Sequence, residues 1–289
     1  MEAAGKRYIA YGSRRDEITI WNLSDLHLMS RACAMDELRA DVRRIRDDPY
    51  SFWLGGGDYV DFIGYRDKRF DPDSVAEDVT VSELGDLGRA GMERARDLLY
   101  PIRDKCLGLL LGNHEKSYQR RTEHESLHGW LCAELETRSL GYCALFDVVF
   151  VRDSGHDLPV LYVAPPWKDP NRCTTWRQRI FCHHGAGYAQ TPGGKLNRLI
   201  RFMNYFDADI YFTGHVHDQV GKRIVRLGAN AGCTKLVQRT KIGVVSGSYL
   251  KTYAQGVITY GEQRGYEPVS LGAAYVQVKP DAGEVRGEL

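Results

Sequence analysis

The sequence predicts an α/β protein, in which strands and helices alternate through the first half of the chain. Apolar runs of strand length recur at residues 18–23, 51–54 and 107–111, with stretches of helical period between them. Each of these runs ends in a short polar cluster that contains Asp, His or Asn. Because ligands bind beyond the carboxyl ends of strands in open α/β sheets, we expect these clusters to meet in space.

Two helices and one long loop connect the strands of the first half. Apolar residues at helical spacing predict the first helix at residues 35–45, and Pro49 closes that segment. The second helix is expected around residues 87–100 and stops at Pro101. Residues 62–86 are polar and rich in turn-forming residues, with no clear period, and they predict an exposed loop insertion.

The second half of the chain is richer in strands. Four apolar runs predict strands, at residues 145–151, 160–166, 179–185 and 209–217. A helix around residues 195–206 separates the last two, and beyond residue 217 short apolar runs with glycine-marked turns predict antiparallel strands. No repeat or linker marks a domain boundary, so residues 1–289 are expected to form a single domain.

Composition and charge narrow the function classes. Charged residues make up 27% of the chain and hydrophobic residues 43%, which is typical of a soluble globular protein. The formal net charge of +1 weakens a nucleic-acid interpretation, because duplex-DNA binders usually contain a strongly basic domain, but it leaves room for a small basic groove. The seven cysteines include no C-x-x-C pair, which is typical of reduced thiols. No apolar run is long enough for a signal peptide or a membrane span, so a cytoplasmic location is expected.

Five polar clusters follow the predicted strands. They are Asp25 and His27 in SDLH, Asp58 and Asp61 in GDYVD, Asn113 and His114 in GNHE, His183 and His184 in CHHG, and His215 and His217 in GHVH. Carboxylate, imidazole and amide ligands without thiolate suit divalent ions such as Mn, Fe or Zn. Five such clusters, all at strand ends, predict a metal site rather than core histidines or solvated loops.

The ordered series SDLH, GDYVD, GNHE, HHG and GHVH resembles the calcineurin-like metallophosphoesterases. The resemblance spans residues 24–217, and all five blocks occur in the family order. It implies a four-layer αββα sandwich with two mixed β-sheets and a metal site at the strand ends. It also implies a metal-dependent phosphoric ester hydrolase that acts on a phosphate-ester substrate.

The resemblance further implies a site for two divalent ions. Its expected ligands are Asp25, His27 and His217 for one ion, Asn113, His183 and His215 for the other, and Asp58 as the bridge between them. The family's ligand in the CHHG block aligns best with His183, and His184 is the alternative. Manganese is the expected metal, with iron or zinc as alternatives.

Such a site can hydrolyse a phosphate ester. Two cations about 3.5–4 Å apart can clamp a phosphate oxygen and lower the pKa of a shared water. The hydroxide that bridges them would attack phosphorus in line, while both ions neutralise charge in the transition state. His114 is expected to give a proton to the leaving oxygen. The resemblance implies that Asp61 holds this histidine.

Departures from the family pattern indicate a branch. In the protein serine/threonine phosphatases an Arg follows the second Asp of the GDxxD block, whereas this chain has Phe62. SDLHL and GHVH are more similar to the phosphodiesterase and nuclease branches, and residues 55–73 resemble phosphoesterases common in phage and prophage genomes. We therefore expect hydrolysis of a nucleotide or nucleic-acid phosphodiester. A phosphomonoesterase with the same metals and a non-catalytic binding scaffold are the alternatives.

The stretch HESLH, residues 124–128, offers a competing interpretation. It matches H-E-x-x-H, which on a helix places two histidines on one face to bind zinc beside the glutamate. A zinc protease needs a third ligand, and the extended motif fails because Leu131 and Glu134 stand at its remaining positions. We therefore expect a helix after GNHE, with one or both of His124 and His128 near the mouth of the metal site.

Overall fold

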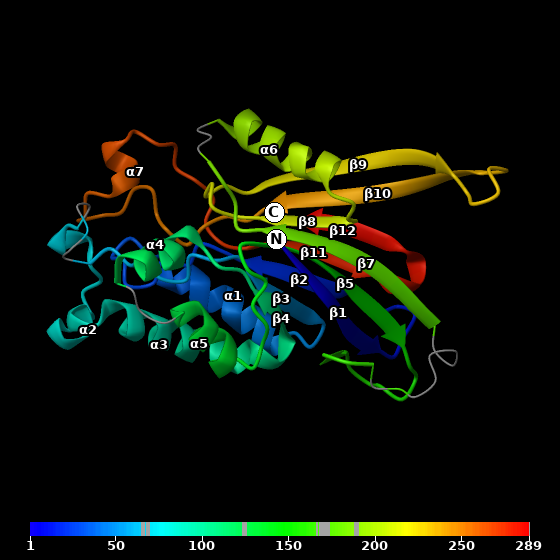
Figure 1. Ribbon diagram of the computed structural model, residues 1–289, viewed down its shortest axis with the longest axis horizontal. Coiled ribbons are helices and arrows are strands. Elements are labelled where there is room, and N and C mark those ends of the chain that lie inside the picture. Colours follow the sequence, from blue (N-terminus) through cyan, green and yellow to red (C-terminus); the bar gives the residue numbers. More distant parts are fainter. Residues whose placement is uncertain are drawn as a thin grey trace.

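The computed structural model describes residues 1–64, 67, 70–122, 126–165, 167, 174–187 and 191–288. Two β-sheets pack face to face, and helices cover the outer face of each sheet (Figure 1). Both sheets contain parallel and antiparallel pairs. The α/β class and the sandwich of two mixed sheets are therefore confirmed. The expected single domain stays a prediction.

The smaller sheet has five strands. Their spatial order is β12 (Glu284–Glu288), β11 (Ala274–Lys279), β2 (Ile18–Leu23), β3 (Ser51–Gly55) and β4 (Cys106–Leu109). Strands β2, β3 and β4 run parallel, and β11 runs antiparallel to both of its neighbours. The carboxyl ends of β2, β3 and β4 consequently lie at one edge of the sheet.

The larger sheet has seven strands. Their spatial order is β6 (Val160–Tyr162), β1 (Glu2–Tyr11), β5 (Cys143–Arg152), β7 (Thr174–His183), β8 (Ile210–Thr213), β10 (Leu236–Val245) and β9 (Val220–Ala229). Strands β7 and β8 are parallel to each other, so their carboxyl ends also lie together. Side chains from both sheets, such as Ile20, Phe52, Phe146 and Phe212, form the apolar core between them.

Helices form the two outer layers. The smaller sheet is covered by α1 (Met35–Asp47), α3 (Leu87–Leu99) and α5 (Leu127–Glu134), and the larger sheet by α6 (Pro192–Tyr205). Helix α1 shows why, because Leu38, Val42 and Ile45 recur at helical spacing and pack on the sheet. The described residues also form α2 (Val81–Gly85), α4 (Asn113–Thr122) and α7 (Tyr260–Gln263), and the 3₁₀ helices η1 (Pro72–Ser74), η2 (Tyr100–Lys105) and η4 (Pro280–Ala282).

The structure differs from the sequence prediction in a few places. Residues 62–86 are not entirely a loop, because η1 and α2 lie within them. The strands expected at residues 179–185 and 209–217 end earlier, at His183 and Thr213, so the polar clusters that follow belong to loops. Among the residues that the structure describes, no helix has both the length and the apolar character needed to cross a membrane.

Candidate metal centre

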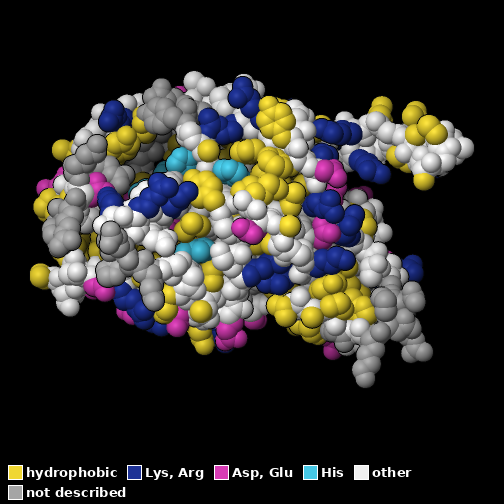
Figure 2. Space-filling view, viewed as in Figure 1, with side chains coloured by type: hydrophobic (Ala, Val, Ile, Leu, Met, Phe, Trp, Pro, Cys, Tyr) yellow, Lys and Arg dark blue, Asp and Glu magenta, His cyan; other side chains and the backbone are white. Residues whose placement is uncertain are grey.

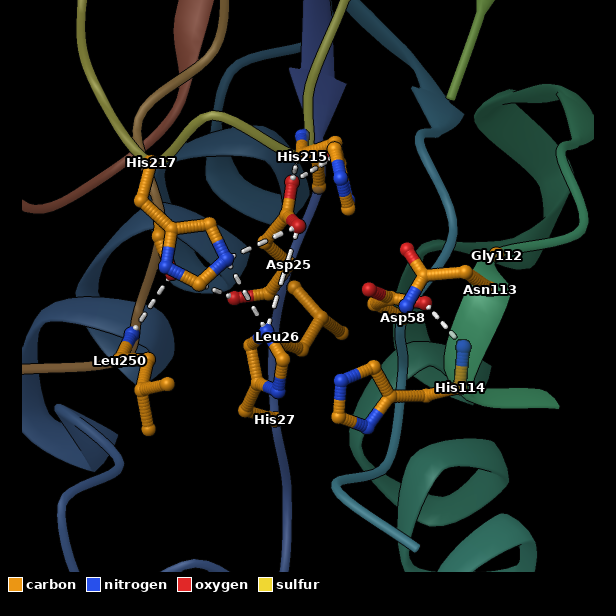
Figure 3. Close-up of polar contacts among 12 residues, drawn as sticks. Asp25, Leu26, His27, Asp58, Gly112, Asn113, His114, His215, His217 and Leu250 are labelled. Carbon is orange, nitrogen blue, oxygen red and sulfur yellow. Dashed lines mark hydrogen bonds and ion pairs between the residues drawn. The ribbon is translucent and has the colours of Figure 1, made fainter. Parts of the chain in front are cut away.

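The polar clusters of the sequence converge at one end of the sandwich. Loops after β2, β3 and β8 carry Asp25, Asp58 and His215, and Asn113 begins α4 just beyond β4. Figure 3 shows these side chains facing a common space, with Asp25, His27 and His217 on one side of it and Asp58, Asn113 and His114 on the other. Chain segments nearly 200 residues apart thus build one site.

The backbone at this site is strained. Five of the converging residues have left-handed φ angles, namely Asp25 (56°), His27 (48°), Asp58 (55°), His215 (70°) and His217 (48°). Each such conformation in a residue other than glycine costs of the order of 1–3 kcal/mol. Strain gathered in this way is typical of functional sites, where the surrounding fold imposes the geometry.

Asp25, His27 and His217 form the first group of potential metal ligands. Their ligand atoms all lie within 4.8 Å of one another. Asp25 Oδ1 is 3.3 Å from His217 Nε2 and 3.9 Å from His27 Nε2, and it accepts no hydrogen bond from the described residues. A buried carboxylate oxygen without a donor is costly. A divalent ion among these three side chains would satisfy it.

The second group joins Asp25, Asp58, His184 and His215, again with ligand atoms within 4.8 Å. The side-chain amide of Asn113 also belongs here, because one of its two terminal atoms lies 2.8 Å from His215 Nδ1, 2.9 Å from His184 Nε2 and 3.2 Å from Asp58 Oδ2. The amide nitrogen of Asn113 in that place donates to these three groups, whereas a divalent ion bound among them would be met by the amide oxygen. The chemistry of this donor set fits a divalent ion such as Mn, Fe or Zn.

The second histidine of the CHHG block, His184, is the one that enters this group. Its Nδ1 atom donates to the main-chain oxygen of Gly56 at 2.7 Å, which directs Nε2 at the centre. Burial lowers the pKa of His184, but the adjacent Asp58 carboxylate outweighs it and raises the pKa to about 10.

The structure does not bring the His183 side chain to the centre, contrary to the expectation from the alignment of the CHHG block. The His183 ring stacks on Phe202 of α6 at 4.8 Å, and its Nδ1 accepts a hydrogen bond from Gly185 N at 2.8 Å. Burial lowers its pKa to about 4. The physical reason is that neighbouring residues at the end of β7 point to opposite sides of the sheet.

His114 and Asp61 lie beside the second group. His114 Nδ1 donates to the main-chain oxygen of Asp61, and the Asp61 carboxylate is 3.7 Å away. The same carboxylate is closer to His27, with Oδ1 3.2 Å from Nδ1. Burial alone would lower the pKa of His114, but the negative charges of Asp58 and Asp61 outweigh burial, so the pKa of His114 is raised. Asp61 therefore touches both histidines.

Glu115 is a structural residue of the site to which the sequence analysis assigned no role. Its carboxylate accepts main-chain N–H groups of Asp58 at 3.1 Å, Tyr59 at 2.6 Å and Gly112 at 2.9 Å. Burial and the charge of Asp58 raise its pKa to about 7. Glu115 thereby holds the loop that carries Asp58, and its place in the GNHE block was the available signal.

Close backbone approach explains two glycines in the polar clusters. A Cβ atom at Gly112 would collide with Asp58, and one at Gly214 would collide with Ser24 and Asp25. Only glycine lets these loops pass beside the ligand carboxylates.

The HESLH segment lies apart from the centre as far as it is described. His124 and Glu125 fall outside the described residues. His128 lies in α5, is buried, and has Nε2 3.1 Å from Ser139 Oγ, so it is not at the mouth of the site. It belongs to none of the potential ligand groups formed by the described residues.

Comparisons with known proteins agree with this chemistry. The sequence profile of the family described as calcineurin-like phosphoesterase matches residues 18–219. A comparison with curated proteins gives no significant match.

Two solved structures are similar to this chain at low identity. One is a conserved uncharacterized protein of Streptococcus pneumoniae, described as a predicted phosphoesterase, with 11% identity, a TM-score of 0.32, and coverage of 91% of this chain and 84% of that chain. The other is the NAD nucleotidase of Haemophilus influenzae, with 10% identity, a TM-score of 0.38, and coverage of 95% of this chain and 49% of that chain.

The family profile matches well over half of the chain, and it includes all five polar clusters. This chain therefore belongs to the calcineurin-like phosphoesterase family and is a metal-dependent phosphoric ester hydrolase.

Proposed function

We propose that this protein is a two-metal phosphodiesterase that hydrolyses a nucleotide or nucleic-acid phosphodiester. The observation that carries the proposal is the pair of adjoining ligand groups, which share Asp25. Asp58 belongs to the second group and also lies with His27 and His114 in a third. A carboxylate so placed can bridge two cations and offset their mutual repulsion.

The ligands divide between two ions in this proposal. Asp25, His27 and His217 would hold the first, and Asn113, His184 and His215 would hold the second, with Asp58 serving both. His184 thus replaces His183, the residue expected from sequence. Divalent ions bound here, with manganese as our choice, would supply charge neutralisation at the phosphate and activation of water.

His114 is the proposed proton donor to the leaving oxygen. Its Nδ1 is engaged by the main-chain oxygen of Asp61, which fixes the ring and leaves Nε2 as the atom that can give a proton. His114 N also donates to Asp58 Oδ1 at 2.8 Å, so the histidine is tied to the bridging carboxylate. Asp61 acts through His114 and is a positioning residue.

Phe62 supports a diester rather than a monoester substrate. It is buried and stacks on Tyr118 with ring centroids 4.8 Å apart. At this position, where the phosphatases that the chain resembles carry an arginine, the side chain is uncharged and cannot itself pair with the additional charge of a monoester. We therefore propose that the chain belongs to the phosphodiesterase and nuclease branch, of the type found in phages. We also propose a cytoplasmic location.

The experiment compares bis-p-nitrophenyl phosphate with p-nitrophenyl phosphate on metal-stripped protein to which Mn²⁺ is added back. We expect turnover to depend on Mn²⁺ and to favour the diester. Preference for the monoester would show a phosphomonoesterase instead. Absence of turnover on both substrates, with metal bound, would favour a binding scaffold.

A further inference from the structure

One segment of this chain carries basic residues without any acidic ones. Residues 219–261 contain seven Lys and Arg and no Asp or Glu, although the whole chain has a formal net charge of only +1. This segment begins two residues after His217 of the metal centre, beyond Asp218, and includes strands β9 and β10. The overall charge therefore hides a strongly basic element next to the site.

Strands β9 and β10 form a projecting arm, residues 220–245. They pair in antiparallel register from Val220 and Val245 to Ala229 and Leu236, a length of about 33 Å for ten residues. Only residues 242–245 of β10 also pair with β8. The outer part of the arm is consequently a two-stranded ribbon, which extends beyond the body of the molecule (Figures 1 and 2).

Basic side chains lie together on one face of the arm. Ile224 packs against the apolar cluster that contains Leu199 and Met203 of α6, and the alternation of side chains along β9 places Lys222 and Arg226 on the same face as Ile224. Arg239 stands directly opposite Arg226 in the register. Like charges in that position destabilise a strand pair, which indicates a role for them other than stabilising the arm.

The cations on this face of the arm have no acidic partner in the part of the chain that the structure describes. Arg226 donates to Met203 O at 3.5 Å and Asn204 Oδ1 at 3.3 Å, at the end of α6. Lys222, Lys235 and Arg239 make no side-chain hydrogen bond or ion pair with any residue that the structure describes. Their charge is therefore free to meet an external anion.

Helix α6 continues the basic surface toward the metal centre. Arg198 and Arg201 lie one turn apart on it and likewise form no ion pair within the described part of the chain. The Arg198 guanidinium lies so close to Gly187, in the loop after CHHG, that a Cβ there would collide with it. Figure 2 shows dark blue side chains over α6 and at the base of the arm, on the same face as histidines.

Protection of an exposed sheet edge does not explain this surface. Lysines on edge strands such as β9 do discourage pairing with other chains. Arg198 and Arg201 are on a helix, however, where no strand edge needs protection. All these residues carry a positive charge that has no acidic partner among the described residues, and they lie on one side of the metal centre.

We propose that a basic face binds the phosphate backbone of a nucleic acid. This face is made of Arg198, Arg201, Lys222, Arg226 and Arg239, and Lys235 extends its charge into the turn between β9 and β10. The inference rests on the proposed function and narrows its substrate to a polymer, because a free nucleotide is far shorter than a face about 30 Å long. Contacts to successive phosphates release counterions and guide the strand to the centre. A two-stranded β-ribbon also has the width to enter a major groove.

The opposite face of the arm exposes apolar side chains, which could bind a partner other than a nucleic acid. Val225, Leu227 and Leu236 are exposed on it, with 47%, 72% and 76% of their surface accessible. A second copy of this chain could cover such an apolar surface. Dimerisation through the arm is therefore the competing outcome.

The test uses a fluorescent DNA duplex with hydrolysis-resistant phosphorothioate linkages. Fluorescence anisotropy measures the affinity of the protein for this duplex at salt concentrations between about 50 and 200 mM. The variant is Lys222→Gln/Lys235→Gln/Arg239→Gln, which spares Arg226 and its contacts with α6. We expect affinity about tenfold lower than that of the native chain and a salt slope smaller by roughly 3. Single-stranded DNA and duplex RNA probes identify the kind of nucleic acid.

The matched control is Lys6→Gln/Arg14→Gln/Arg15→Gln, which removes the same charge from exposed residues of the N-terminal segment. The control should bind the duplex as the native chain does. The proposal would be overturned if both variants lost affinity equally, or if the native chain did not bind the duplex. It would also be overturned if the native chain bound no nucleic acid but formed a dimer that the arm variant abolished. Turnover of bis-p-nitrophenyl phosphate should be the same in all three proteins. If the native chain bound the duplex but did not hydrolyse this diester, the proposed function would be contradicted and the nucleic-acid surface would not.

Discussion

His184 donates a hydrogen bond from Nδ1 to the main-chain oxygen of Gly56 at 2.7 Å, and this contact directs its Nε2 toward the metal centre. The bond fixes both the tautomer and the orientation of the ring, as second partners of metal-bound histidines commonly do. It joins the loop after β7, in one sheet, to the end of β3, in the other. The two sheets are thus linked through a proposed metal ligand.

His184→Ala should remove one ion and lower turnover by at least about 100-fold, because its Nε2 has no substitute in the second ligand group. His183→Ala should leave the metal content unchanged, because that ring packs on Phe202. Metal content by mass spectrometry and turnover of bis-p-nitrophenyl phosphate check both. The reverse pattern, with metal lost only from His183→Ala, would contradict our assignment.

His114→Ala should retain both ions but lose about 10²–10⁴-fold in kcat on a diester with a poor leaving group. The loss should be much smaller with p-nitrophenolate, which leaves without a proton. A linear free-energy series of aryl and alkyl diesters measures the difference. If the variant kept the full rate on the poorest leaving group, His114 would not be the acid.

His128 should make stability depend on pH without affecting catalysis. Burial lowers its pKa from 6.5 to about 4. Because the folded state resists protonation, the stability it contributes is present above pH 6.5 and is lost as the pH falls toward 4, up to about 3 kcal/mol in total. His128→Gln should reduce this loss, as measured by urea unfolding across that range.

Turnover of bis-p-nitrophenyl phosphate by His128→Gln should stay close to that of the native protein, since His128 stacks on Tyr59 and belongs to none of the potential ligand groups formed by the described residues. A variant that lost activity together with zinc would revive the protease interpretation. An unchanged dependence of the free energy of unfolding on pH would remove His128 from the acid transition.

Shortening the insertion at residues 70–80 to a glycine-serine linker should change substrate preference more than metal content. Val75 forms a bridge with Ser30, and Ala76 N donates to Met29 O at 2.9 Å, so the insertion adjoins the loop that carries His27. Loops around a rigid scaffold often set specificity. The ratio of kcat/KM for two diesters checks this, and an unchanged ratio would exclude the segment from substrate choice.

Fully buried strands were the easiest elements to predict from sequence. β2 coincides with its predicted bounds, because all six of its residues are buried and read as a continuous apolar run. Strand β1 was not predicted, since polar residues occupy its exposed first half. The polar clusters after β2, β3 and β4 were visible because each follows an apolar run directly. Their convergence could be predicted because parallel strands end at the same edge of a sheet.

Other features depended on information that the sequence does not carry. Choosing between His183 and His184 requires the register of β7, and a shift of one residue reverses which side chain faces the centre. The basic face was hidden by a net charge of +1, because acidic residues elsewhere in the chain cancel it. Glu115 was visible in GNHE, but its three main-chain partners come together only in the fold.

The most direct test of the central claim is the number of Mn²⁺ ions bound per chain at saturation, measured by calorimetry together with the electron paramagnetic resonance spectrum. We predict two ions with a spin-coupled spectrum, because Asp58 is proposed to bridge them, and loss of both the coupling and the diester turnover in Asp58→Asn. A single ion at saturation, or two ions whose coupling and activity survive in Asp58→Asn, would contradict the two-metal account.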